Sequence, residues 1–337
     1  MNPEVSIIIP CYNSEAYIAR ALESVFHQTH RNFEIILIDD ASKDSTLEIA
    51  RSFSDRRLKI ISNQQNRGVS YGRNCGIDAA TGNWIALLDS DDWYAPQRLE
   101  KLLSAAVKTN ADMIADDLYL IRDRESQPWG SLLQENNSEQ SSIQSIDAVE
   151  FVKSDRPNPL NTKRNWSLGY TKLLIKREFL IKHDLRYNED INVGEDYTLY
   201  LECLRKQAHF VLLPEAYYFY RARMTSLSTR QPTEYLSESC QITQSFIDLE
   251  KCDRSTPLLL KTLAENLYIF QRRLAYYRLL EAIKQKQLIK IVQQIIQHPY
   301  TLVYLFNKFI KVLSNKNRSI ATKKQNQIVF NFASSKK

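Results

Sequence analysis

Residues 5–13 read Val-Ser-Ile-Ile-Ile-Pro-Cys-Tyr-Asn, a short β-branched apolar run that ends in a proline, an aromatic residue and an amide. Such a run is typical of a strand buried in a parallel sheet. From here to residue 115, strand patterns alternate with helix patterns. Strands are predicted at 5–9, 33–38, 58–61, 84–88 and 113–115, and helices at 15–28, 44–53, 70–80 and 96–108. This alternation predicts an α/β fold with a mostly parallel central sheet and flanking helices.

The rest of the chain is predicted to be less regular up to residue 230 and helical beyond it. Residues 122–146 are polar and predict a loop or mobile flap. Further helices are predicted at 147–153, 177–182, 195–206, 235–249, 257–284, 286–297 and 301–313, and strands at 170–175, 210–213 and 217–221. We therefore expect an α/β domain at 1–230, with halves 1–116 and 117–230, then a basic helical region at 231–320 and a disordered tail at 321–337.

The composition is that of a soluble globular protein, with 43% hydrophobic and 25% charged residues among 337. No signal peptide is expected, because residues 1–4 lead directly into a strand. No apolar stretch approaches the ~20 residues of a membrane-spanning helix. The five cysteines are scattered without zinc-site spacing, which favours free thiols in a reducing compartment and a cytoplasmic protein.

The net charge of +6 is distributed unevenly. After residue 250 there are 17 Lys/Arg against 3 Asp/Glu, a net of +14, whereas the preceding residues carry −8. A basic tail predicts contact with an anionic surface such as the inner face of the cell membrane, and residues 301–311 have the pattern of an interfacial amphipathic helix. The alternatives are a basic face packed on the acidic body and a homodimer contact. Nucleic acid is not expected, because Tyr268, Tyr276 and Tyr277 fall at helical core spacing.

Residues 87–92, Leu-Leu-Asp-Ser-Asp-Asp, run from an apolar strand into three carboxylates. If the strand continues, Asp89 and Asp91 project to the same side, because side chains alternate with period two. Two hard oxygen ligands on one side suit Mg²⁺ or Mn²⁺ carrying a diphosphate. The alternative is a solvated turn in which Asp92 helps to cap the helix near Pro96.

Three further strand or helix ends carry candidate ligand-binding residues, and in an open parallel sheet ligands bind beyond the carboxyl ends of the strands. Tyr12 is placed to offer its ring to a base, and Asp40 to accept a hydrogen bond from a base or ribose. The helix from residue 70 favours a phosphate at its start, where Arg73 adds a bidentate contact. The alternatives are packing for Tyr12, a helix cap for Asp40 and an ordinary surface position for Arg73. Gly72 and Gly76 share one helix face, which permits close approach of a strand or a ligand.

In this order, the motifs resemble those of family 2 glycosyltransferases of the GT-A fold over residues 4–230. The segments that carry the resemblance are Ser6-Ile7-Ile8-Ile9-Pro10-Cys11-Tyr12-Asn13, Ile38-Asp39-Asp40-Ala41-Ser42-Lys43-Asp44-Ser45, Asn66-Arg67-Gly68 with Arg73-Asn74, and Asp89-Ser90-Asp91-Asp92. The resemblance implies that residues 1–116 bind a nucleotide through Pro10, Tyr12, Asn13, Asp39, Asp40, Arg73, Asp89 and Ser90. It also implies that Asp89 and Asp91 form a DxD motif for Mn²⁺ or Mg²⁺, with Asp91 the preferred ligand, and that Asp92 meets metal or acceptor.

The second half also resembles this family. Trp166, Lys172 and Arg177-Glu178-Phe179-Leu180 resemble its acceptor-side segment, and Glu195-Asp196 its ED motif, in which the Asp is the catalytic base. In isolation, Asp196 also reads as a helix cap. Arg221 and Arg223 lie in the segment that resembles the closing strand and loop. Many relatives have His in place of Arg223, and because an Arg cannot ligate a cation we expect it to neutralise the diphosphate instead.

The resemblance thus predicts an inverting, metal-dependent transfer of a sugar, from a UDP-sugar by preference, to a hydroxyl of a glycan or lipid-linked acceptor. One alternative is a non-catalytic protein that binds sugar nucleotides or glycans. The other is a sugar-phosphate nucleotidyltransferase. Such an enzyme would have a glycine-rich loop directly after the first strand, whereas residues 10–13 of this chain are Pro-Cys-Tyr-Asn.

Overall fold

The computed structural model describes residues 3–123, 125–135, 142–156, 167–191, 193–222, 232–253, 257–303 and 305. Trp166, Arg223, the predicted tail at 321–337 and most of the predicted helix at 301–313 lie outside these residues. The chain divides into two compact units. The first contains residues 1–230 and 238–267, and the second contains 231–237 and 268–337. Within the described part of the chain, no helix is long and apolar enough to cross a membrane.

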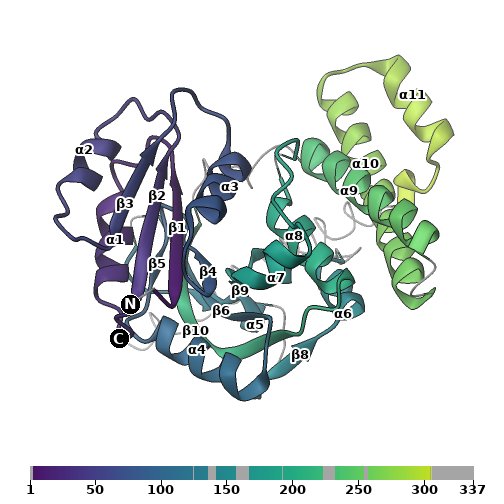
Figure 1. The fold of residues 1–337 in the computed structure, drawn as a ribbon. Helices are drawn as coiled ribbons and strands as arrows, with labels where there is room; N and C mark the ends of the chain where they lie inside the picture. Colours follow the sequence, from purple (N-terminus) through teal and green to yellow (C-terminus); the bar gives the residue numbers. More distant parts are fainter. Residues whose placement is uncertain are drawn as a thin grey trace, which may run out of the picture. The chain divides into compact units, whose positions relative to one another are not determined.

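One sheet organises the first unit (Figure 1). Its strands are β1 Val5–Cys11, β2 Phe33–Asp39, β3 Leu58–Ser62, β4 Trp84–Leu87, β5 Trp93–Tyr94, β6 Met113–Arg122, β7 Gly130–Ser131, β8 Gln144–Ile146, β9 Leu174–Lys176 and β10 Phe210–Ala222. The order is β3-β2-β1-β4-β9-β6-β10-β5, with β7 beside β6 and β8 beside β10. The neighbours β3, β2, β1 and β4 are parallel, as are β6 and β10, whereas β9 runs antiparallel to β4 and β6. The predicted α/β class with a mostly parallel sheet is confirmed.

Helices cover both sides of this sheet, with α1 and α2 on one side of β1–β3 and α3 on the other (Figure 1). The helices of the first 230 residues are α1 Ile18–Phe26, α2 Thr46–Arg51, α3 Val69–Ala79, α4 Arg98–Thr109, α5 Leu132–Glu135, α6 Ala148–Ser154, α7 Arg177–Lys182 and α8 Glu195–Arg205. Beyond them lie α9 Pro232–Asp253, α10 Pro257–Lys284 and α11 Leu288–Gln297. Apart from α5, which was not predicted, the helical periodicity of the sequence located these helices to within a few residues at each end.

Two predictions of local structure were wrong. The segment 122–146, predicted to be a loop, contains β7, α5 and β8 among its described residues, and these strands pair with β6 and β10. The predicted strands at 210–213 and 217–221 are one strand, β10, whose register against β6 shifts between Leu212 and Tyr218. Pro214 lies in that irregular stretch, where the missing N–H of a proline is tolerated, so it did not end the strand as the sequence suggested.

The close approach predicted for the glycine face of α3 is confirmed. A Cβ added at Gly76 would lie 2.4 Å from Cγ2 of Ile8, whereas one at Gly72 would make an ordinary 3.5 Å contact with Cβ of Pro10. A side chain at position 76 would therefore hold α3 away from β1. α3 also carries Arg73, whose side chain reaches Asp89 in the acidic segment after β4. The close packing of α3 on β1 therefore helps to position Arg73.

Candidate active site

The acidic segment after β4 is a tight turn and not a continued strand. The backbone N–H of Asp92 donates to the carbonyl oxygen of Asp89 at 3.0 Å. The premise that alternation places Asp89 and Asp91 on the same side was therefore wrong. The suggested helix cap was wrong too, because α4 begins at Arg98 and the Asp92 carboxylate accepts bonds from the Tyr218 hydroxyl (2.7 Å) and the Arg221 N–H (2.8 Å).

Asp92 is buried, with 2% of its surface exposed. Burial raises the pKa of its carboxyl well above the ordinary range, and the charges of Asp91 and Asp89 raise it further. Asp92 thus joins the turn to β10 as a hydrogen-bonded, structural residue. Asp91 is half-buried, as are Asp89 and Ser90.

Arg73, on α3, connects the acidic turn to the start of α8. Its guanidinium contacts Asp89 Oδ1 at 2.9 Å, Glu195 Oε1 at 2.9 Å and Asp196 Oδ1 at 3.0 Å. The side chain is 2% exposed, so the alternative of an ordinary surface arginine was wrong. Burial disfavours the charged guanidinium, but the charges of Asp196 and Asp89 raise the pKa of Arg73 above its ordinary value.

Lys172 also connects the acidic turn to the start of α8. Its Nζ lies 2.9 Å from Asp89 Oδ2 and 2.8 Å from Asp196 Oδ2. The backbone carbonyl of Lys172 accepts a bond from Arg98, which is itself fully buried and paired with Asp116 at 2.8 Å. The buried Arg98–Asp116 pair on α4 and β6 therefore holds the backbone from which Lys172 reaches the cluster.

We call Arg73, Lys172, Asp89, Glu195 and Asp196 the charge cluster. Two cations face three carboxylates, so the cluster carries a formal charge of −1. Burial works against ionised Asp89, yet Lys172 and Arg73 lower the pKa of its carboxyl well below the usual range. Charges that are desolvated together in this way must compensate one another, because an unpaired buried charge is strongly destabilising.

The two carboxylates at the start of α8 have different surroundings. Asp196 is buried and accepts bonds from Arg73, Lys172 and the hydroxyl of Tyr187, the last at 3.2 Å to Oδ1. Glu195 contacts Arg73 and is more exposed, and burial together with the charge of Asp196 raises the pKa of its carboxyl. The cap alternative for Asp196 was wrong, because Gly194 precedes the helix and no side chain caps it.

Five of the eight residues predicted to bind a nucleotide, Pro10, Tyr12, Asn13, Asp39 and Asp40, lie at the carboxyl ends of β1 and β2. Tyr12 is 43% exposed, so its ring is not a packing element of the core. Asn13 ties the two strand ends together: its N–H donates to Ser42 Oγ at 3.0 Å and its Oδ1 accepts the N–H of Lys43 at 2.8 Å. Pro10 is buried against the helix face that carries Gly72.

Asp40 shapes the loop that leads into α3. Its carboxylate accepts bonds from Asn63 Nδ2 (2.8 Å) and from the N–H groups of Arg67 (3.0 Å) and Gly68 (2.8 Å). The helix-cap alternative was wrong, since Asp44 provides the carboxylate that accepts the N–H of Thr46 at the start of α2. Asp39 is buried at the end of β2.

Ser90 and Arg221 fasten the acidic turn to its neighbours. The hydroxyl of Ser90 lies 2.8 Å from that of Ser14 in the loop after β1. Arg221 donates from Nε to the Asp91 carbonyl at 3.0 Å, and its guanidinium lies over the rings of Tyr17 and Trp93 at 5.1 and 5.0 Å. Both residues thus contribute to the position of Asp91.

Sequence reasoning missed Tyr187 and Arg98. Tyr187 lies in a polar segment between predicted helices, where no local pattern distinguishes a tyrosine that bonds a buried carboxylate. Arg98 occupies the first turn of an amphipathic helix and reads as a solvated charge. Its burial depends on Asp116, and two acidic residues in the middle of an apolar strand were the available signal.

In the described part of the chain, no group of three or more His, Cys, Asp or Glu side chains is arranged to hold a metal ion. A divalent cation that carries a diphosphate needs only one or two carboxylates from the protein. Asp91 fits that requirement. Both oxygens of Asp89 face cations, so Asp89 fits only if Arg73 or Lys172 gives way, and its role as a ligand stays a prediction.

The structure thus combines a mixed, largely parallel α/β sheet with a buried charge cluster that joins the end of β4 to the start of α8. The chain belongs to Glycosyl transferase family 2, whose profile matches residues 6–176. It is 28% identical over 303 residues to the succinoglycan biosynthesis protein ExoO of Rhizobium meliloti (strain 1021), covering 90% of this chain and 84% of ExoO.

Two further similarities are informative. Over 117 residues the chain is 38% identical to the Escherichia coli UDP-Glc:alpha-D-GlcNAc-diphosphoundecaprenol beta-1,3-glucosyltransferase WfgD, covering 35% of this chain and 46% of WfgD. The crystal structure of S. aureus TarS 1-349 in complex with UDP-GlcNAc has a similar fold, with a TM-score of 0.62, 18% identity and coverage of 88% and 81%. The prediction of a GT-A fold is confirmed.

Proposed function

We propose that this glycosyltransferase moves a sugar from a UDP-sugar to a hydroxyl of a glycan or lipid-linked acceptor, with inversion at the anomeric carbon. The observation that carries the proposal is the charge cluster, in which the acidic turn and the ED pair share two buried cations. The choice of UDP is supported by the UDP-GlcNAc bound to TarS and by the UDP-Glc donor named for WfgD. The lipid-linked acceptor is supported by the diphosphoundecaprenol in the name of WfgD, and a role in polysaccharide synthesis by that of ExoO.

The nucleotide is proposed to bind at the ends of β1 and β2. The exposed ring of Tyr12 is available to stack on the base. Asp40 orders the backbone N–H groups that precede α3, and Asp39 supports it from the end of β2. Pro10, Asn13 and Ser90 form the floor of this nucleotide site.

Asp196 is the proposed general base. It takes the proton of the acceptor hydroxyl as that oxygen attacks the anomeric carbon, and the bond from this carbon to the diphosphate oxygen breaks, releasing UDP. Two donors contact Oδ1 of Asp196 and one contacts Oδ2, so the carboxylate keeps an acceptor site on Oδ2 for the acceptor hydroxyl. Lys172 and Arg73 are the cations that the diphosphate attracts, so donor binding weakens their hold on Asp196 and prepares it for the acceptor.

Mn²⁺ or Mg²⁺, held by Asp91 with a contribution from Asp89, would stabilise the negative charge on the leaving diphosphate. Arg221 fixes the backbone of Asp91 for that purpose. We assign Arg223 and Lys172 to the diphosphate, and Trp166 and Glu195 to the acceptor side. Asp92, predicted to meet metal or acceptor, is buried and bonded to Tyr218 and Arg221, so we assign it to the support of the acidic turn. We propose reduced thiols and a cytoplasmic location from the five scattered cysteines, whose spacing fits no zinc site.

A screen of UDP-sugars by thermal shift with Mn²⁺, followed by UDP release and NMR of the product anomer, tests the proposal. Asp196→Asn should keep donor binding and lose at least ~100-fold in kcat. Asp190→Asn, an exposed carboxylate in the segment before α8, is the matched control and should be fully active. Asp91→Asn should remove the Mn²⁺ dependence of donor affinity. Donor binding without turnover in the unaltered protein would favour the non-catalytic alternative.

A further inference from the structure

The helix α11, in the second unit, exposes a stripe of large apolar side chains. Leu288, Ile289, Val292 and Ile296 are 75%, 76%, 55% and 73% exposed, and no residue of the helix is buried. Leu288, Val292 and Ile296 are four residues apart and therefore share one helix face, with Ile289 beside them. We call these four residues the α11 stripe. A contiguous apolar surface of this kind marks a contact site, whereas single exposed apolar residues do not.

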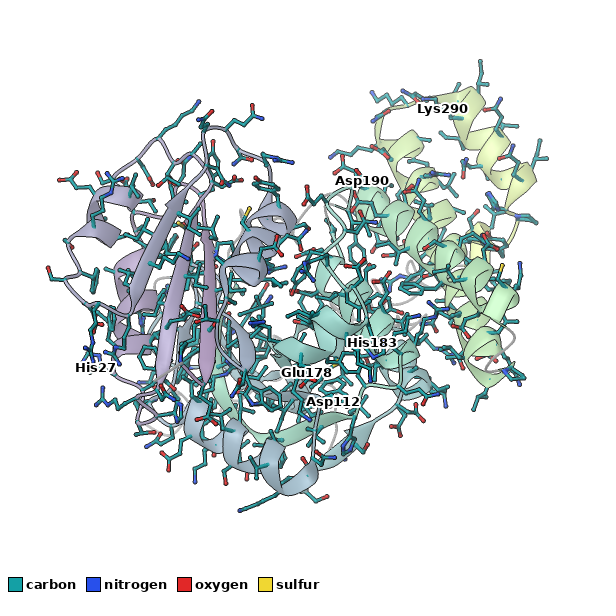
Figure 2. All side chains as sticks on the ribbon, viewed as in Figure 1. His27, Asp112, Glu178, His183, Asp190 and Lys290 are labelled. Atoms are coloured by element: carbon teal, nitrogen blue, oxygen red, sulfur yellow. The ribbon has the colours of Figure 1, made fainter. Side chains whose placement is uncertain are left out.

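The charges that follow Glu281 in the sequence have one sign. Lys290 lies on α11 itself (Figure 2), and Lys284 and Lys286 precede the helix in the chain. Glu281 is the last acidic residue of the sequence: the 56 residues after it contain 11 Lys/Arg and no Asp or Glu. An apolar stripe in a segment whose charges are all cations matches a surface that offers hydrocarbon and negative charge together.

We propose that the α11 stripe docks on an anionic lipid surface, with the helix lying in the plane of the headgroups. The side chains of the stripe enter the boundary of the acyl chains while the lysines contact lipid phosphates. A second copy of the chain is the less suitable occupant, because a two-fold contact brings the same lysines of both copies towards each other. The proposal rests on α11 alone and is independent of the reaction at the charge cluster.

Flotation of the full chain with vesicles tests the proposal. The protein should float with equimolar phosphatidylcholine and phosphatidylglycerol, and not with phosphatidylcholine alone. Val292→Gln/Ile296→Gln should weaken the partition coefficient at least ~10-fold, because the buried apolar area is lost. Lys286→Gln/Lys290→Gln should weaken it ~25-fold, at about fivefold for each lysine near the surface.

The matched control is Val107→Gln/Ile181→Gln, which removes two exposed apolar side chains from the first unit. It should float like the unaltered protein, and all variants should keep the same Tm, since none of the six altered positions is buried. Absence of flotation with anionic vesicles, or equal flotation of the stripe variant, overturns the proposal. So does a dimer in sedimentation velocity that the stripe variant dissociates, because a second copy would then cover the stripe.

Discussion

Replacing Tyr187 with Phe isolates one of the three hydrogen bonds that hold Asp196. The Tyr187 hydroxyl donates to Asp196 Oδ1 at 3.2 Å, and its ring lies 5.1 Å from the Arg73 guanidinium. Phe keeps the ring, and with it the contact to the cation, but removes the donor. The contacts of Asp196 with Arg73 and Lys172 remain, so the carboxylate is still paired.

The size of the effect follows from the lost hydrogen bond. A bond to a charged group contributes about 1.5 kcal/mol, which corresponds to roughly a factor of ten in a rate constant. Its removal leaves the Asp196 carboxylate with two donors in place of three and less firmly oriented. If Asp196 is the base, kcat/KM should therefore fall about tenfold, and the free energy of unfolding should fall by about 1–2 kcal/mol.

The assay is kcat/KM for UDP release in the presence of acceptor, with urea unfolding in parallel. Tyr200→Phe is the matched control, since the hydroxyl of Tyr200 is equally buried but donates to the backbone carbonyl of Thr171 at 3.2 Å. The control should lose a similar amount of stability, about 1 kcal/mol, and keep the kcat/KM of the unaltered enzyme. If Tyr187→Phe also keeps that kcat/KM, the hydroxyl of Tyr187 does not act through the reacting base, and the role of Asp196 as base is refuted.

Three predictions concern stability. Arg98→Met should cost about 3–5 kcal/mol, measured by urea unfolding, because it leaves a carboxylate buried in β6 without its cation; a loss below 1 kcal/mol would contradict the pairing. Gly76→Ala should cost about 1–3 kcal/mol through overlap with Ile8, whereas Gly72→Ala should be neutral or stabilising, and equal Tm values would contradict this contrast. Burial raises the pKa of Asp155 to about 7, above the ~3.9 of the unfolded chain, so the stability it contributes is full below about pH 4 and is lost as the pH rises to about 7. Asp155→Asn should gain about 2–4 kcal/mol at pH 7.5 relative to pH 4, and Tm curves that stay parallel across this range would contradict the shift.

Much of the fold could be predicted because the informative patterns are local. Strands β1 to β4 are short apolar runs, and Pro10, Asp39 and the acidic segment mark the ends of β1, β2 and β4. The spacing of the apolar residues along the chain is enough to separate these strands from the helices. The stretch 122–146 was misread because its strands gain their stability from edge pairing with β6 and β10 and not from their own composition. Local pattern does not report which distant strand will offer a free edge.

The candidate site divides in the same way. The types and positions of Asp89 and Asp196 could be found in the sequence because each stands in a short motif at the end of an element. Their pairing through Arg73 and Lys172 could not, since these residues come from separate segments: Arg73 and Asp196 are 123 positions apart. The prediction that Asp89 and Asp91 project to the same side, as alternate residues of a strand do, was also wrong. The chain turns after Asp89, where the strand was assumed to continue.

The sequence by itself determined the α/β class, the order of the motifs and the membership in family 2 that the motifs express. The tertiary structure decided which charges are buried, which carboxylate faces which cation, and that the α11 stripe is exposed among the described residues. The physical reason is distance. Propensity and periodicity act between neighbours in the chain, whereas charge compensation and burial depend on atoms brought within about 3–4 Å by packing of segments that the sequence keeps far apart.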